Sequence, residues 1–147
     1  MRVLVDTNVL LRLFDRQNPL FAMSRAAVQK LTDRNDQLVV APQSIAELWN
    51  VCTRPSAARG GFGLSIMETN RRVRAIERGF TILPEDGLLY PAWRELVLKY
   101  DVQGLNVYDA RLAAFMQVHG ITHLLTMNVQ DFQRYTTIAT IHPAEVT

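Results

Sequence analysis

The stretch Val3-Leu4-Val5-Asp6-Thr7-Asn8 sets three apolar residues directly before three polar ones near the start of the 147-residue chain. An uninterrupted apolar run of this kind predicts a strand that is buried on both faces, as in a parallel sheet. Asp, Thr and Asn favour the ends of strands and the first positions of helices. The stretch therefore predicts the first strand of an α/β fold, with the carboxylate of Asp6 at its carboxyl end.

The rest of the chain alternates short apolar runs with segments of helical spacing. Further strands are predicted at residues 38–40, 80–83 and 123–126, with a short edge strand at 137–141. Helices are predicted directly after Asn8 and over about residues 19–30, 42–54, 65–78, 90–100 and 107–119, with a mobile glycine-rich loop over 55–65. This alternation implies right-handed crossovers and helices on both faces of the sheet. We therefore predict a three-layer α/β/α sandwich around a mostly parallel sheet of about four to five strands, folded as one domain over residues 1–147.

Composition narrows the class of protein. Hydrophobic residues make up 48% and charged residues 20% of the chain, which is ordinary for a globular protein and gives no support to a disordered or fibrous class. No apolar run approaches the roughly 20 residues that cross a bilayer, and the first residues lack a secretory signal, so we expect a cytoplasmic protein. Cys52 is the only cysteine and the three histidines are scattered. A disulfide within the chain and a cysteine-bound zinc site are excluded, and any metal is expected among oxygen ligands.

Polar side chains follow the predicted strands where ligands bind in open α/β sheets. Asp6 ends the first strand, and Asn128 and Asp131 follow the fourth. Glu47 falls on the early turns of the helix after the second strand, at the margin of its apolar stripe. These positions share the carboxyl-end side of the sheet, so we expect their side chains to converge.

Asp109 lies on a predicted helix face with Leu112, Ala113 and Met116, which should face the core. A buried carboxylate is costly unless it is paired or binds a metal. Converging carboxylates repel one another until a divalent cation neutralises them, and hard oxygen ligands are typical of Mg²⁺ or Mn²⁺. Asp109 therefore joins the other acids in a predicted metal site.

Each acid also has a simpler role when it is taken alone. Asp6 and Asp131 are suited to capping helices, Asp109 to interacting with a helix macrodipole, and Glu47 to forming a surface ion pair. The shared side of the sheet favours the joint metal site, because independent helix caps need not face the core.

The segment from Arg54 to Arg78, in the middle of the chain, is basic. Its net charge is +4, although the whole chain carries only +2. Arginine recognises phosphate better than lysine does, which suggests contact with nucleic acid, although a solvated helix face has the same composition. The RNA-contact candidates are Arg54, Arg59, Arg71 and Arg72, and the segment also holds Arg74 and Arg78 against Glu68 and Glu77.

Four pieces of the sequence occur together in one order. They are Val5-Asp6-Thr7-Asn8, a helical Glu47, Tyr108-Asp109-Ala110, and Thr126-Met127-Asn128-Val129-Gln130-Asp131-Phe132. Together they resemble the PIN-domain family over the whole chain, and at this length the VapC-type toxins of type II toxin–antitoxin systems. The resemblance implies that Asp6 and Asp109 are the principal metal-binding acids, with Glu47 the remaining early acid. It also implies that Asn8 orients the cluster and that Thr7 or Thr126 contacts phosphate.

The chain departs from the family pattern at one position. Many PIN domains have an acid where this chain has Asn128, and Asp131 follows three residues later. An amide oxygen ligates a metal weakly and brings no charge to hold a second ion. The number of metal ions, one or two, is therefore left open.

The resemblance implies a Mg²⁺- or Mn²⁺-dependent endoribonuclease that cleaves RNA with a metal-activated water. Two alternatives are a metal-bound RNA-binding module without hydrolysis, and a haloacid-dehalogenase-like phosphohydrolase that uses Asp6 as nucleophile. The last fits poorly, because Asn8 stands where a second Asp is needed and the only lysines are Lys30 and Lys99.

The resemblance further implies two protein partners. One is a cognate antitoxin that blocks the site, and the other is a second copy of the chain in a homodimer. Phe62, Leu64 and Trp93 are candidate partner contacts if their side chains are exposed, although core packing is an equal alternative for Trp93.

Overall fold

A five-stranded, wholly parallel β-sheet forms the centre of the protein in the computed structural model, which describes residues 1–147. The strands lie in the order β3-β2-β1-β4-β5, and every neighbouring pair is parallel. This confirms the predicted parallel sheet. The strands are β1 (Arg2–Val5), β2 (Gln37–Val40), β3 (Thr81–Ile82), β4 (His123–Leu125) and β5 (Ala139–Ile141).

Six α-helices and two short 3₁₀ turns connect the strands, and the helices agree with the predicted ones to within a few residues. The helices are α1 (Thr7–Arg12), α2 (Phe21–Asp33), α3 (Pro42–Thr53), α4 (Ile66–Gly79), α5 (Leu89–Lys99) and α6 (Asn106–His119). The 3₁₀ turns are η1 (Val129–Phe132) and η2 (Pro143–Glu145). None of these helices is both long and apolar enough to traverse a membrane.

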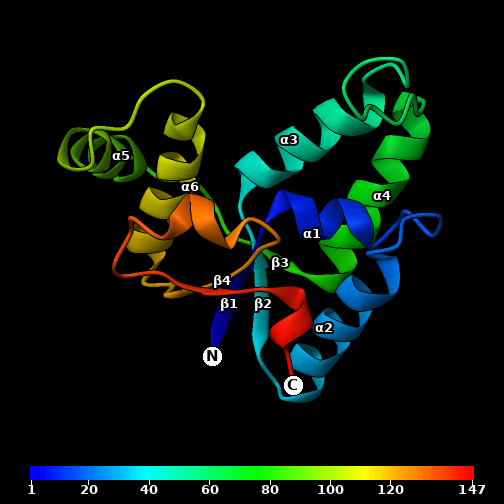
Figure 1. The fold of residues 1–147 in the computed structure, drawn as a ribbon, viewed down its shortest axis with the longest axis horizontal. Helices are drawn as coiled ribbons and strands as arrows, with labels where there is room; N and C mark the ends of the chain where they lie inside the picture. Colours follow the sequence, from blue (N-terminus) through cyan, green and yellow to red (C-terminus); the bar gives the residue numbers. More distant parts are fainter.

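Both faces of the sheet are covered, which confirms the predicted three-layer α/β/α sandwich. Alternate residues of β1 point to opposite faces, so Val3 and Val5 join one apolar cluster and Leu4 joins the other. The first cluster is completed by α1 to α4 and the second mainly by α6, with α5 packed outside it. In Figure 1, α1 to α4 accordingly lie to the right of the strands, and α5 and α6 to the left.

The order of the strands creates a switch point beside β1. The chain builds β1, β2 and β3 outward in one direction, then crosses through α5 and α6 to place β4 on the other side of β1. In such sheets a crevice opens beyond the carboxyl ends of the two strands at the switch point. Asp6 follows β1 there, and its backbone N–H donates to the carbonyl of Leu125 at 3.0 Å.

The glycine-rich loop, which the sequence predicts to be mobile, is attached to the preceding helix by backbone hydrogen bonds. Backbone N–H groups of Phe62, Gly63 and Leu64 donate to carbonyls of α3 and its end, at 2.8 to 3.0 Å. Phe62 and Leu64 are only partly exposed and pack against the first apolar cluster. These two side chains therefore contribute to the core of this protein rather than forming a free surface for a partner.

Candidate active site

Asp6 is the most deeply buried acid of the predicted site, with 9% of its surface exposed. Its Oδ1 accepts a hydrogen bond from the backbone N–H of Thr7 at 2.7 Å, so the residue does cap α1. Its Oδ2 accepts from the hydroxyl of Thr126 at 2.7 Å and from the side-chain amide of Asn8 at 3.1 Å. Asp6 therefore both caps α1 and contributes its carboxylate to the predicted site.

Asn8 and Thr126 hold the ends of β1 and β4 together around this carboxylate. The amide of Asn8 donates to the Thr126 hydroxyl at 3.2 Å, and its oxygen accepts from the backbone N–H of Met127 at 3.1 Å. The Thr126 hydroxyl also accepts from the backbone N–H of Asn128 at 3.0 Å. Since Thr126 is fully buried, its hydroxyl orients the Asp6 carboxylate and does not reach toward a phosphate.

Glu47 reaches the same cluster from α3. Its Oε2 accepts from the hydroxyl of Thr7 at 2.8 Å, and its Oε1 accepts from the side-chain amide of Gln43 at 2.9 Å. Glu47 is not part of any salt bridge in the protein, which removes the surface ion pair as an explanation for it. The Thr7 hydroxyl is buried and acts within the cluster, as that of Thr126 does.

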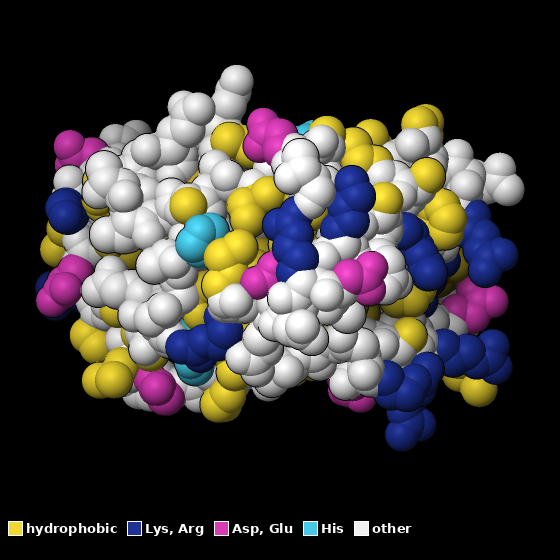
Figure 2. Space-filling view, turned by 90° about the horizontal axis from the view of Figure 1, so that it is seen from below, with side chains coloured by type: hydrophobic (Ala, Val, Ile, Leu, Met, Phe, Trp, Pro, Cys, Tyr) yellow, Lys and Arg dark blue, Asp and Glu magenta, His cyan; other side chains and the backbone are white.

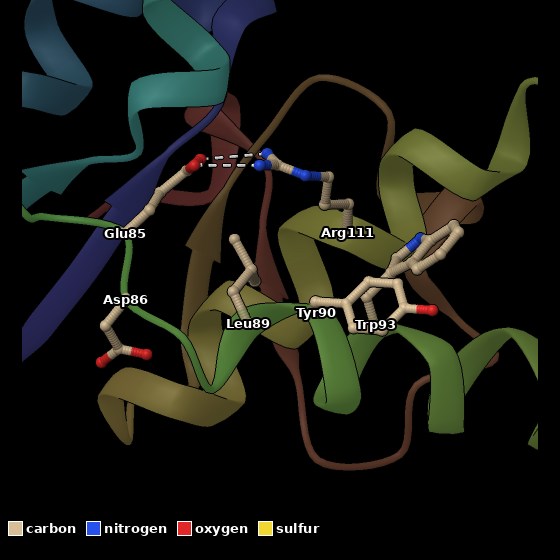
Figure 3. Close-up of a pocket in the computed structure, with 6 residues that line it drawn as sticks. All are labelled: Glu85, Asp86, Leu89, Tyr90, Trp93 and Arg111. Atoms are coloured by element: carbon tan, nitrogen blue, oxygen red, sulfur yellow. Dashed lines mark hydrogen bonds and ion pairs between the residues drawn. The ribbon is translucent and has the colours of Figure 1, made fainter.

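A line of polar contacts behind Glu47 was not predicted from the sequence. Gln43 donates to Glu47 and accepts from the guanidinium of Arg111 at 2.9 Å. Arg111 in turn forms a two-point ion pair with Glu85 at 3.0 and 2.9 Å, as Figure 3 shows. The spacing of Gln43 and Glu47, one helical turn apart, is a local signal for their contact. Arg111 and Glu85 come from distant segments, and no sequence pattern connects them.

Asp109 and Asp131 complete a cluster of acids that act on one another electrostatically. Burial raises the pKa of Asp6 to about 6, with smaller contributions from the charges of Glu47 and Asp131. Burial likewise raises the pKa of Asp109 to about 6, followed by repulsion from Asp131, Asp6 and Glu47, and Arg134 opposes this shift. The four acids that the sequence singles out are therefore within electrostatic reach of one another.

Asn128 and Asp131 lie at the outer edge of the cluster. Both are exposed and line a hollow of about 540 Å³. Asp131 lies inside η1, whose capping position is occupied by Asn128, so the helix-cap alternative does not apply to Asp131. Its carboxylate is free to serve the site from the rim.

The donor atoms of the cluster have the chemistry that a divalent metal ion requires. Its donors are carboxylate oxygens that take part in none of the protein's salt bridges, and two of them have a raised pKa. Hard oxygen donors of this kind are the ligands that Mg²⁺ and Mn²⁺ prefer. The side chains as they stand do not bring three carboxylate, histidine or cysteine groups close enough to enclose an ion. The residues fit such a cation by their chemistry, without forming a closed coordination shell.

The arginine candidates have different surroundings. Arg59 and Arg71 are exposed, and Arg54 is half-buried and donates to the carbonyl of Arg59 at 3.1 Å. The guanidinium carbon of Arg72 lies 5.7 Å from the ring centres of both Phe14 and Phe62, so Arg72 packs against the core. On the face seen in Figure 2, Lys and Arg side chains gather on the right, the side of helices α1 to α4.

Comparison with known proteins places this site in a family. A model of the PIN domain matches residues 3–137. The chain belongs to the PIN domain family. No curated protein matches its sequence significantly, but many solved structures share its fold.

Three solved structures illustrate the similarity of this PIN domain to known folds. VapBC2 from Rickettsia felis, bound to promoter DNA, aligns with a TM-score of 0.73 at 13% identity, covering 97% of this chain and 98% of that one. VapBC-1 from nontypeable Haemophilus influenzae aligns with 0.71 at 18% identity, over 97% and 98%. VapC20 of Mycobacterium tuberculosis, described as a sarcin-ricin loop cleaving toxin, aligns with 0.57 at 17% identity, over 83% and 86%. At these identities the likeness shows the fold.

Replacing Asp109 with Asn should stabilise the metal-free PIN domain at neutral pH. The pKa of Asp109 is raised from 3.8 to about 6, so its ionised form is disfavoured in the folded state. The penalty grows as the pH rises through this window, is full above about pH 6, and vanishes below the unfolded pKa. We expect a gain of about 1–2 kcal/mol at about pH 8 after solvent screening, and no gain at about pH 4.

Thermal unfolding in EDTA at the two pH values measures this effect. Glu95→Gln is the matched control, because Glu95 is an exposed acid on α5 outside the cluster. A gain for Asp109→Asn that is the same at both pH values would contradict repulsion as its cause.

Proposed function

We propose that this PIN domain is a divalent-metal-dependent endoribonuclease and the toxin of a toxin–antitoxin pair. The observation that carries the nuclease assignment is the set of acids at the switch point of the sheet. Asp6 and Asp109 are held there with raised pKa values and without a basic partner in any salt bridge. A protein keeps such repelling charges together at a cost to its stability, and a functional site explains that cost.

In the proposed mechanism, Asp6 and Asp109 hold Mg²⁺ or Mn²⁺ with the help of Glu47. A bound divalent ion supplies a water of lowered pKa and stabilises the charge that develops on the phosphate. Water, and not the ribose 2′-hydroxyl, would be the nucleophile. Asn8 and Thr126 fix the orientation of the Asp6 carboxylate, and Thr7 does the same for Glu47. Asp131 adds negative charge at the exposed rim of the cluster.

The structural relatives support the substrate and the partner of this proposal. The mycobacterial relative is described as cleaving the sarcin-ricin loop, which favours RNA as the substrate class. Others are complexes of toxin with antitoxin, which favours a protein antitoxin for this chain. A cluster of carboxylates is a natural target for an arginine of such a partner. A homodimer in the cytoplasm completes the proposal.

One alternative is favoured by a specific observation. Asn128, an uncharged residue, stands at the rim where many PIN domains have an acid, so a metal held here could be structural, as in a metal-bound RNA-binding module without hydrolysis. The phosphohydrolase alternative is disfavoured, because Asn8 stands where that pattern needs a second Asp, and its side-chain amide donates to the Asp6 carboxylate at 3.1 Å.

Cleavage of RNA by the purified protein tests the nuclease directly. We expect cleavage of structured RNA in Mn²⁺ or Mg²⁺, none in EDTA, and a loss of at least about 100-fold for Asp6→Asn and for Asp109→Asn, because each removes a charge from the metal site. Glu95→Gln, which removes an exposed acid outside the cluster, should cleave like wild type. RNA binding without cleavage across a series of metals would instead identify the non-catalytic module.

Gln43→Ala should weaken the metal dependence rather than abolish cleavage. The amide of Gln43 holds one oxygen of Glu47 and links it to Arg111. Losing such an outer contact typically costs about 10-fold or more in metal affinity or activity, so the Mn²⁺ concentration for half-maximal cleavage should rise by about that factor. Gln29→Ala is the control, because Gln29 makes the same contact, with Asp33, one turn along α2. Equal metal dependence of the two variants would show that Gln43 does not position Glu47 for the metal.

The toxin role has its own test in cells. Expression of the wild-type chain alone should arrest growth, whereas Asp109→Asn should not, because it lacks a charge that the metal site needs. Co-expression with the product of the neighbouring open reading frame should relieve the arrest. Normal growth on expression of active, soluble wild-type protein would rule out the toxin role while leaving the nuclease intact.

A further inference from the structure

A second hollow, which we call the aromatic hollow, opens beside the acidic cluster. Its volume is about 330 Å³, at the lower end of the range of roughly 300–1,000 Å³ for small-ligand pockets. This size suits one planar ring system better than an extended chain. As Figure 3 shows, its lining residues come from α5, α6 and the segment before α5: Glu85, Asp86, Leu89, Tyr90, Trp93 and Arg111.

The aromatic hollow has a fixed interior and an exposed edge. Leu89 is 5% exposed and belongs to the second apolar cluster. The indole N–H of Trp93 donates to the carbonyl of Val107 at 2.8 Å, which fixes the plane of the ring. Tyr90 is 67% exposed, and its ring centre lies 6.3 Å from that of Trp93 with the planes tilted by 37°. An incoming ring therefore meets one indole held in place and one phenol open to solvent.

The aromatic hollow is continuous with the catalytic cluster. Arg111 and Glu85 line both this hollow and a neighbouring one of about 520 Å³, which contains Glu47 and the exposed ring of Tyr108. A strand that passes Glu47 would therefore cross the Arg111–Glu85 ion pair before it reaches Trp93. Among the four acids only Glu47 lines the neighbouring hollow, so Glu47 is the acid that connects the site with the aromatic hollow.

The charges of the aromatic hollow favour a base over a phosphate. Arg111 is paired with Glu85 through its two terminal nitrogens, Nη1 and Nη2, so its charge is largely neutralised. Asp86 adds an unpaired carboxylate, whose Oδ1 accepts from the backbone N–H of Leu88 at 2.8 Å. One net negative charge repels a phosphate, whereas an uncharged ring with N–H groups gains acceptors for hydrogen bonds. Unpaired bases stack on aromatic side chains in this way.

We propose that the aromatic hollow binds one unpaired nucleobase of the RNA substrate. This inference rests on RNA as the substrate and deepens the proposed function, because it names the part of the RNA that the protein reads. A base seated on Trp93 and Tyr90 places its strand across Glu47, so the hollow selects single-stranded or loop segments and sets where the cut falls relative to that base.

Binding in EDTA tests the site independently of cleavage. A short fluorescein-labelled single-stranded oligoribonucleotide is titrated with protein and followed by anisotropy. We expect Tyr90→Ala to weaken binding by about ten-fold, which is within the range for loss of one stacked base. Leu98→Ala is the matched control, since Leu98 is a 70% exposed apolar residue of the same helix, and it should bind like wild type. Equal affinity of the two variants would overturn the proposal.

A second readout uses the two tryptophans of the chain, Trp49 and Trp93. An unlabelled oligoribonucleotide should quench the intrinsic fluorescence of wild type and of Trp49→Phe, and Trp93→Phe should lose most of the quenching. An RNA with abasic residues in place of all its bases should bind wild type about as weakly as the intact RNA binds Tyr90→Ala. Quenching that survives in Trp93→Phe, or undiminished binding of the abasic RNA, would contradict a base in this hollow.

The oligomeric state separates the remaining explanations. If Tyr90→Ala converts a dimer to a monomer in size-exclusion chromatography, the hollow is an interface between copies of the chain, and the base-binding proposal fails. If RNA binds with Tyr90-dependent affinity but is not cut in Mn²⁺, the nuclease proposal fails and the base site stands. If RNA is cut but binding does not depend on Tyr90, the nuclease stands and the base site fails.

Discussion

The buried carboxylate of Asp6 is the constraint on which the arrangement of this PIN domain depends. It lies where β1 ends and α1 begins, and its oxygens accept hydrogen bonds from Thr7, Asn8 and Thr126. These contacts join the end of β1 to the end of β4, two strands that are adjacent only because the chain reverses its direction of strand addition between them. Without an acceptor at this point, the buried Thr126 hydroxyl would lose the group to which it donates, and the Asn8 amide would lose one of its two acceptors. A buried donor left without a partner is destabilising.

Burial of these carboxylates lowers the stability of the folded protein when they are ionised. Desolvation is the largest cause of the raised pKa of both Asp6 and Asp109, and repulsion among the acids adds to it. Neutral donors surround Asp6 and Glu47, and the guanidinium closest behind them, that of Arg111, is occupied by Glu85. A cation inside the cluster would be stabilising. The protein offsets the repulsion only in part, through the charge of Arg134 near Asp109, and in the proposed function a divalent ion from solution would neutralise the rest.

The sequence predicts what depends on local pattern and fails where contacts are distant. Apolar runs revealed every strand, and the strand-end rule brought Asp6 and Asp131 to the correct edge of the sheet. The contact of Gln43 with Glu47 has a local signal, because the two lie one helical turn apart, whereas Arg111 and Glu85 meet Gln43 only through the tertiary fold. The charge count also makes Arg72 an RNA-contact candidate like the neighbouring arginines, whereas its guanidinium packs against Phe14 and Phe62. Charge composition does not tell which face of a helix a side chain occupies.

Basic and aromatic side chains lie on different sides of the sheet, and in the proposed function they would contact different parts of one RNA strand. Most basic side chains belong to the half of the chain that forms α1 to α4, as the right of Figure 2 reflects, and they suit the phosphate backbone. The aromatic hollow belongs to the half formed by α5 and α6 and carries a net negative charge, which suits a base. The acids lie between these halves, at the switch point of the strands. If RNA is the substrate, as proposed, backbone and base would be held on opposite sides, and the phosphate between them would pass over the acids.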